Sequence, residues 1–126
     1  MCEKNADREG VGSRCTFQHG DANRLDFPDE SFDAVVSNYV YHNIIGADKQ
    51  KLLLETLRVL KKGGVFALND DMKPRMYGEM EAFAQELRDM GYADVHLIDT
   101  AQDAFGSHRR AAAMMLGASR MLVGRK

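Results

Sequence analysis

The residues best suited to chemistry follow an apolar run, Phe32–Asn38, whose composition is typical of a strand buried on both faces. Ser37 and Asn38 end this run, and open α/β sheets bind ligands beyond the carboxyl ends of their strands. His42 follows, and an imidazole can act as a general base near neutral pH. The alternatives are polar residues that cap the strand end and a structural histidine before a helix. The pattern predicts a ligand site here, with His42 as a candidate base.

Two acidic groups elsewhere carry weaker patterns. The first comprises Asp26, Asp29, Glu30 and Asp33. It lacks the central glycine and the terminal glutamate of a calcium loop, so we expect a solvated loop. The second group, Asn69–Asp71, follows another apolar run, where acids either hold a substrate amine or cap a turn. We favour the turn. The remaining histidines lack ligand spacing, so no metal site is predicted.

Composition excludes several classes of protein. The 126 residues are 44% hydrophobic and 29% charged, which suits one globular domain over residues 1–126. A net charge of −2 argues against a nucleic acid or an anionic membrane as partner. No apolar run is long enough to span a bilayer, and the N-terminus has no signal-peptide core. Cys2 and Cys15 form no CxxC motif, so reduced thiols and a cytoplasmic location are predicted.

Helices and strands are expected to alternate along the chain. Three segments have helical patterns: Cys2–Glu9, a segment that is capped by Asp48 and ended by Lys61–Gly64, and Met76–Met90 before Gly91. A fourth helix of undefined limits is expected within Thr100–Ser119, which Gly106 and Gly117 interrupt. Strands are expected at Cys15–His19, Phe32–Asn38, Val65–Leu68, Val95–Ile98 and Met121–Val123. This alternation predicts an α/β fold with a mostly parallel sheet flanked by helices.

Several fragments together resemble one enzyme family. They are GDA at Gly20–Ala22, FPDESFD at Phe27–Asp33, VVSNYVYHNI, LRVLKKGG and the strand after it. Each fragment alone is weak, but they occur in the order found in class I S-adenosylmethionine-dependent methyltransferases of the small-molecule and ubiquinone-methyltransferase-like type. The resemblance covers nearly the whole chain and implies a Rossmann-like methyltransferase fold.

The resemblance also implies roles for particular residues. Asp21 would accept a hydrogen bond from the adenine amino group of S-adenosylmethionine, and the backbone of Ala22 would meet a ring nitrogen. Ser37 and Asn38 would lie beside the methionine part of this cofactor. The segment with Tyr41 and His42 would face a small-molecule methyl acceptor, which makes these two the candidate catalytic residues. The alternative for Asp21 is a loop carboxylate that stabilises its own turn.

One expected part of the cofactor site is missing. The family begins with a strand, a glycine-rich loop that opens a helix, and a second strand that ends in an acid for the ribose. Gly10, Gly12 and Gly20 do not replace this loop, because Gly10 and Gly12 stand after the expected helix and before the expected strand, which is the reverse of that context. We therefore expect a partial fold without the first two strands, and weak or no activity from this chain.

The missing strands also predict self-association. The family's strand order, 3-2-1-4-5-7-6, would leave Phe32–Asn38 at an edge of the sheet. An unpaired apolar edge is an association site. We expect either that Cys15–His19 pairs beside Phe32–Asn38, or that two chains pair or swap elements there as a homodimer. The alternative function is accordingly a non-catalytic, self-associating fragment or interaction module.

Overall fold

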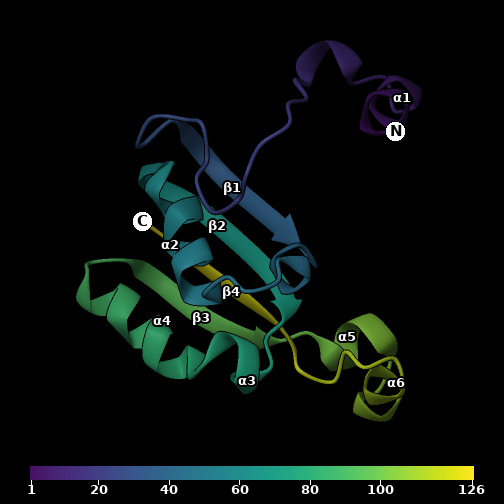
Figure 1. Ribbon diagram of the computed structural model, residues 1–126, viewed down its shortest axis with the longest axis vertical. Coiled ribbons are helices and arrows are strands. Elements are labelled where there is room, and N and C mark those ends of the chain that lie inside the picture. Colours follow the sequence, from purple (N-terminus) through teal and green to yellow (C-terminus); the bar gives the residue numbers. More distant parts are fainter.

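The computed structural model describes residues 1–126, and its helices and strands alternate along most of the chain (Figure 1). In chain order, the elements are α1 (Cys2–Arg8), β1 (Phe32–Asn38), α2 (Lys49–Arg58), β2 (Leu60–Asp71), α3 (Pro74–Tyr77), α4 (Met80–Asp89), β3 (Ala93–Asp99), α5 (Ala101–Phe105), α6 (His108–Ala113) and β4 (Ser119–Arg125). Two 3₁₀ helices, Gly12–Arg14 and Tyr41–Asn43, precede and follow β1.

The four strands form one sheet in the order β1-β2-β4-β3. β1 pairs with β2 in parallel, whereas β4 pairs antiparallel with both β2 and β3. Three strands therefore share a direction and β4 runs against them. A mostly parallel sheet was expected, and three of the four strands do run in one direction. Because β4 runs against both of its neighbours, the sheet is mixed. The arrangement corresponds to the 4-5-7-6 half of the expected strand order, so the partial Rossmann-like fold is confirmed.

The helix α2 begins as the sequence predicts and ends earlier. The Asp48 side chain accepts hydrogen bonds from the backbone N–H groups of Gln50 and Lys51, at 3.0 and 3.3 Å. The helix ends at Arg58, and the Lys61–Gly64 segment belongs to β2 instead of the helix end. The ladder between β1 and β2 is irregular at this point. A Cβ on Gly64 would lie 2.8 Å from the carbonyl oxygens of both Asp33 and Lys61, so the close approach of backbone requires glycine.

The predicted helix Met76–Met90 is two helices, α3 and α4. Gly78 separates them with a φ of 67°, a conformation that a helix interior does not allow. Met80, Phe83 and Leu87 are buried as their spacing predicts, whereas Met90 lies beyond the end of α4 and is exposed. In the same way, Gly106 separates α5 from α6 with a φ of 73°.

The N-terminal segment departs furthest from expectation. The helix α1 forms, but it lies apart from the sheet (Figure 1). The predicted strand Cys15–His19 is wrong, because this segment has no strand partner and its side chains are exposed. Its expected pairing beside β1 is therefore wrong too. No apolar burial holds the segment against the sheet, so local β propensity alone does not make it a strand.

The sheet has one covered face and one open face. Fifteen buried residues form the core, in which Leu53 and Leu57 of α2 and Phe83 of α4 pack with Phe66 and Leu68 of β2. The opposite face carries Val36, Ala67 and Val123 at paired positions of β1, β2 and β4. β1 is an edge strand. Val36 is 82% exposed, so the expectation that this strand is buried on both faces is wrong.

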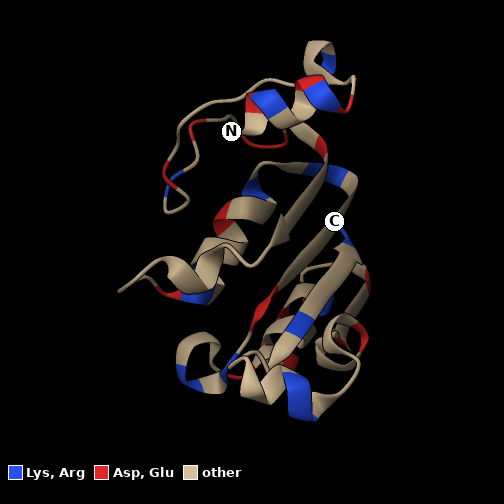
Figure 2. Cartoon of the chain, turned by 90° about the vertical axis from the view of Figure 1, so that its right-hand side faces the viewer, with Lys and Arg blue, Asp and Glu red and all other residues tan.

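Charged residues of both signs are interspersed along the elements (Figure 2). None of the helices combines the length and the hydropathy that a bilayer-spanning helix requires.

Candidate functional site

The candidate site lies where the parallel strands β1 and β2 end side by side. Asn38 and Asn69 are register partners at these ends, and the Asn69 Nδ2 donates to the Asn38 Oδ1 at 2.8 Å. The Asn38 side chain is exposed. The Ser37 Oγ is buried and makes no hydrogen bond of normal length, with the Tyr41 hydroxyl as a polar neighbour. A buried hydroxyl without a hydrogen bond is costly, so this end of β1 has capacity for one more polar contact.

His42 is held by a buried carboxylate from the neighbouring strand. It lies in the 3₁₀ helix Tyr41–Asn43, and its backbone N–H donates to the Asp70 Oδ2 at 2.9 Å. The His42 Nδ1 lies 2.5 Å from the Asp70 Oδ1. Asp70 is fully buried, whereas the His42 side chain is 27% exposed. The pair leaves the Nε2 of His42 as the ring nitrogen without a protein partner, which is the arrangement of an oriented general base.

Two further groups fix the Asp70 carboxylate. The Tyr77 hydroxyl donates to Oδ2 at 2.6 Å, and the Asp71 N–H donates to Oδ1 at 2.8 Å. Burial, together with the adjacent carboxylate of Asp70, raises the pKa of Tyr77 well above its usual value, so Tyr77 stays a donor.

The role of Asp70 is the part of the site that sequence reasoning missed. Asn69–Asp71 was expected after a strand, either holding a substrate amine or capping the next turn, with the turn favoured. The segment is the end of β2, and Asp70 binds His42. The available signal was that β1 and β2 are parallel neighbours, whose carboxyl ends meet at one edge of the sheet.

Tyr41, the other predicted catalytic residue, points into the core. It is buried, and its hydroxyl lies 2.7 Å from the Thr56 Oγ1 on α2. Burial raises the pKa of Tyr41. Tyr39 turns the other way: it has a φ of 54°, and its hydroxyl lies 2.6 Å from the Ser119 Oγ. The left-handed backbone at Tyr39, directly after β1, is unusual for a bulky residue and marks the end of the strand.

Asp21 and Ala22 lie on a separate loop ahead of β1. The Asp21 Oδ1 accepts from the backbone N–H and the Nδ2 of Asn23, at 2.9 and 2.8 Å. The backbone hydrogen bond, followed by the side-chain one, lowers the pKa of Asp21. Asp21 therefore stabilises its own turn with Oδ1, while Oδ2 accepts no hydrogen bond. Ala22 is half-buried and packs against the core.

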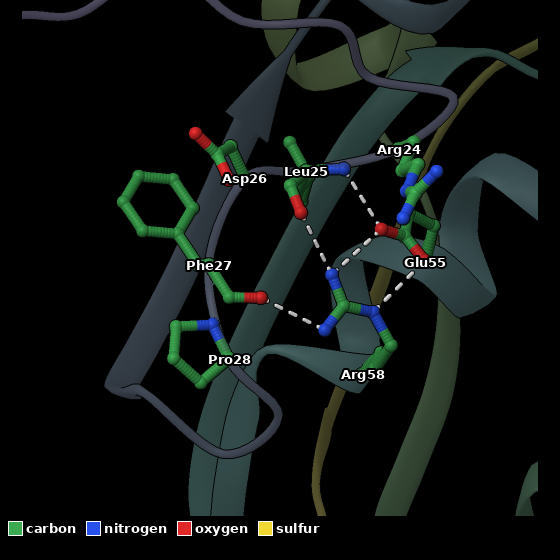
Figure 3. Close-up of a pocket in the computed structure, with 7 residues that line it drawn as sticks. All are labelled: Arg24, Leu25, Asp26, Phe27, Pro28, Glu55 and Arg58. Carbon is green, nitrogen blue, oxygen red and sulfur yellow. Dashed lines mark hydrogen bonds and ion pairs between the residues drawn. The ribbon is translucent and has the colours of Figure 1, made fainter.

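Two cavities adjoin these segments. The larger, of about 710 Å³, lies between the loop that precedes β1 and the helix α2 (Figure 3). In its wall, Arg58 donates to Glu55 and to the carbonyl oxygens of Leu25 and Phe27, so these groups have a structural role. A second cavity, of about 530 Å³, adjoins the His42 side chain and is also lined by Lys49, Arg75 and Met76. The Lys49 Nζ donates to the carbonyl oxygen of Ile44. This cavity is open to a small molecule on the exposed side of His42.

The sequence matches a family model and several curated relatives. Residues 1–68 match the model of the methyltransferase domain. The chain is 31% identical over 104 residues to 27-O-demethylrifamycin SV methyltransferase of Amycolatopsis mediterranei, covering 82% of this chain and 37% of that protein. It is 32% identical over 108 residues to the uncharacterized methyltransferase YcgJ of Bacillus subtilis, covering 84% of this chain and 42% of that one. The chain thus spans about two fifths of the length of these relatives.

Solved structures share the fold at low identity. Geranyl diphosphate C-methyltransferase from Streptomyces coelicolor A3(2), solved with Mg²⁺, geranyl diphosphate and S-adenosyl-L-homocysteine, superposes with a TM-score of 0.65 at 10% identity. The alignment covers 98% of this chain and 58% of that one. The [4+2]-cyclase SpnF superposes with a TM-score of 0.66 at 19% identity, covering 98% of this chain and 61% of the cyclase. The arrangement of strands and the matched domain model together show that this chain belongs to the class I S-adenosylmethionine-dependent methyltransferase family.

Proposed function

We propose that this chain acts in methyl transfer from S-adenosylmethionine to a small-molecule acceptor, with His42 as the general base. The observation that carries the proposal is the His42–Asp70 pair beside Ser37 and Asn38, at the edge where β1 and β2 end. The family membership supplies the reaction class, and the cavity beside His42 supports an acceptor of small size.

The residues present fit one side of the cofactor. The buried Ser37 hydroxyl makes no hydrogen bond of normal length, the Asn38 side chain is exposed, and the Asp21 Oδ2 accepts no hydrogen bond. We propose that Ser37 and Asn38 contact its methionine part, and that Asp21 and the backbone of Ala22 contact its adenine. When bound, S-adenosylmethionine supplies a methyl group activated by a sulfonium. These four residues include neither a glycine-rich loop nor an acidic residue that binds the ribose hydroxyls. We therefore propose that this chain alone binds the cofactor weakly.

His42 would act on the acceptor through Nε2. The hydrogen bond from Nδ1 to Asp70 holds the proton on Nδ1 and leaves a lone pair on Nε2, which takes the proton that the acceptor loses. The buried Asp70 carboxylate then stabilises the imidazolium, as in other oriented bases. Tyr41 has a different part in this proposal: its buried hydroxyl anchors the 3₁₀ helix to α2 and so supports the position of His42.

The test uses S-adenosylmethionine labelled in its methyl group, incubated with the chain and a fraction of cellular small molecules. The wild type should label a small molecule. The H42Q variant should lower this rate by about 10²- to 10⁴-fold and keep its affinity for S-adenosylhomocysteine. The matched control is H108Q, since His108 also pairs with an aspartate, Asp99, but on an exposed helix. Equal rates for wild type and H42Q would refute the role of His42.

A second candidate is a non-catalytic, self-associating module. The unpaired edge of β1 and the exposed Val36 favour it. Under this proposal two chains pair as a homodimer through β1. The two free cysteines, both exposed, suit a reducing compartment, and we propose a cytoplasmic location for either function.

A further inference from the structure

We propose that Arg58 and Glu55 of α2 form a positioning pair, which fixes the loop of residues 21–29 in the conformation that presents Asp21 and Ala22 to the adenine ring. This inference rests on the proposed function.

Every N–H of the Arg58 guanidinium has an acceptor. Figure 3 shows the bonds to Glu55 and to the two loop carbonyls. Two acceptors are loop carbonyls: Nη2 donates to the Leu25 oxygen and Nη1 to the Phe27 oxygen, both at 2.9 Å. A third is the Asp29 carboxylate, 2.7 Å from Nη1. The other two donors, Nε and Nη2, bind the two oxygens of Glu55 at 3.0 and 2.8 Å. A planar fork with five donors matches this spread of acceptors, which an ammonium group does not.

Glu55 completes the pair by binding the loop itself. Its Oε1 accepts the backbone N–H of Leu25 at 2.8 Å, so Leu25 is held through both its N–H and its carbonyl. The Arg58 side chain, followed by the Leu25 N–H, lowers the pKa of Glu55, and Glu55 and Asp29 raise the pKa of Arg58. Both groups therefore stay charged at neutral pH, and the hydrogen bonds between them are of the charge-assisted kind.

The loop has few other attachments near the adenine residues. Residues 21–31 contain no helix and no ladder strand, and the bonds around Asp21 are local, to Asn23 and Arg24. The backbone carbonyls of Arg58 and Val59 accept from Glu30 and Ser31 at the far end of the loop. Ala22 packs against the core, and the Phe27 ring contacts Phe32. Between these contacts the side-chain bonds hold residues 24–29, so their loss would let this segment and the neighbouring Asp21 sample more positions.

The experiment compares the full chain with R58A, R58K and a control, R88A. Arg88 also donates to a backbone carbonyl, that of Val95, but it lies on α4 and does not contact the loop. Amide hydrogen exchange at Leu25, followed by NMR, reports the loop conformation. Titration with S-adenosylhomocysteine in the same samples, at a temperature where each variant is folded, gives the dissociation constant.

We expect R58A and R58K to raise the Leu25 exchange rate and to weaken S-adenosylhomocysteine binding about tenfold, because the loop would be binding-competent for about a tenth of the time. R88A should change neither quantity, even where it lowers the melting temperature as much as R58A. Wild-type exchange and affinity in R58A would overturn the inference.

The same experiment distinguishes failure of the proposed function from failure of this inference. If the wild type does not bind S-adenosylhomocysteine, cofactor binding is refuted and the exchange data alone decide the role of Arg58. Faster exchange confined to residues 21–29 in R58A would uphold its action on the loop, and unchanged exchange would overturn it.

Discussion

Asp70 controls which nitrogen of His42 is available for chemistry. Its carboxylate accepts four hydrogen bonds, two from His42 and one each from Tyr77 and Asp71. A carboxylate held in this way requires the neutral imidazole to carry its proton on Nδ1, where it can donate. The tautomer of His42 therefore reports directly on its hydrogen bond to Asp70. It can be measured without knowing the methyl acceptor.

We predict that neutral His42 in the wild type is more than about nine-tenths Nδ1-protonated, since a charge-assisted bond favours that form by about 1.5 kcal/mol or more. The D70N variant should lose this preference. Long-range ¹⁵N–¹H NMR correlations of the imidazole measure both. The exposed pair of His108 and Asp99, which joins through Nε2, provides an internal control. An unchanged His42 tautomer in D70N would contradict this account of the pair.

Glu55 should make the stability of the chain sensitive to acid. Its pKa in the folded state lies below the usual 4.5, first because of the Arg58 hydrogen bond. The unfolded chain therefore binds more protons in acid, so the contribution of Glu55 is present above pH 4.5 and is lost as the pH falls through the folded-state pKa. We predict that E55Q is less stable than wild type at pH 7, and that the difference narrows between about pH 5 and pH 3. Urea denaturation across this pH range measures it, and a constant difference would refute the prediction.

The pairing of β1 with β2 depends on a close contact of backbone segments where the two strands begin. Gly64 lies against the carbonyl oxygens of Asp33 and Lys61 and the side chain of Leu60. Because two of these neighbours are backbone atoms, they cannot move aside as a flexible side chain would. The glycine therefore permits the irregular pairing at the start of β1 and β2.

We predict that G64A lowers the free energy of unfolding by about 1–3 kcal/mol, the usual cost of forcing extra volume into a packed position. Gly20 is the control, because a Cβ there would meet nothing within 4 Å and its φ is not in the left-handed region. G20A should stay within about 0.5 kcal/mol of wild type in the same urea denaturation. Equal stabilities for G64A and wild type would contradict the assigned role.

Local patterns predicted most of these elements, and contacts between distant residues explain what they missed. The centres of β1, α2, β3 and β4 follow from apolar spacing and from the Asp48 cap, which act within a few residues. The reversal of β4 depends on its pairing with two strands that precede it in the chain. Local patterns were also insufficient for the site. His42 was predicted from its position after β1, but its bond to Asp70 joins residues that only the sheet register brings together.

At the scale of the whole molecule, the open sheet face and the edge of β1 are the features that distinguish this chain from a closed domain. Val36 and Val65 are exposed there, and no other strand pairs with β1 beyond β2. An apolar edge of this kind favours pairing with another chain.

We predict concentration-dependent dimers of the wild type by sedimentation or light scattering, and a monomer for V36K, because a lysine on an edge strand opposes pairing. I45K is the control: Ile45 is 97% exposed but lies outside the sheet, so its substitution should leave the dimer intact. A monodisperse wild-type monomer would exclude the homodimer and remove the support for the self-associating alternative.

The most direct test of the central claim is a titration of the ¹⁵N-labelled chain with S-adenosylhomocysteine. The account predicts saturable shifts at Asp21 and Ala22 and at Ser37 and Asn38, with a dissociation constant below about 1 mM, which corresponds to about −4 kcal/mol of binding free energy. Binding that does not saturate by a few times that concentration, or shifts confined to other segments, would contradict the claim that these residues form a cofactor site.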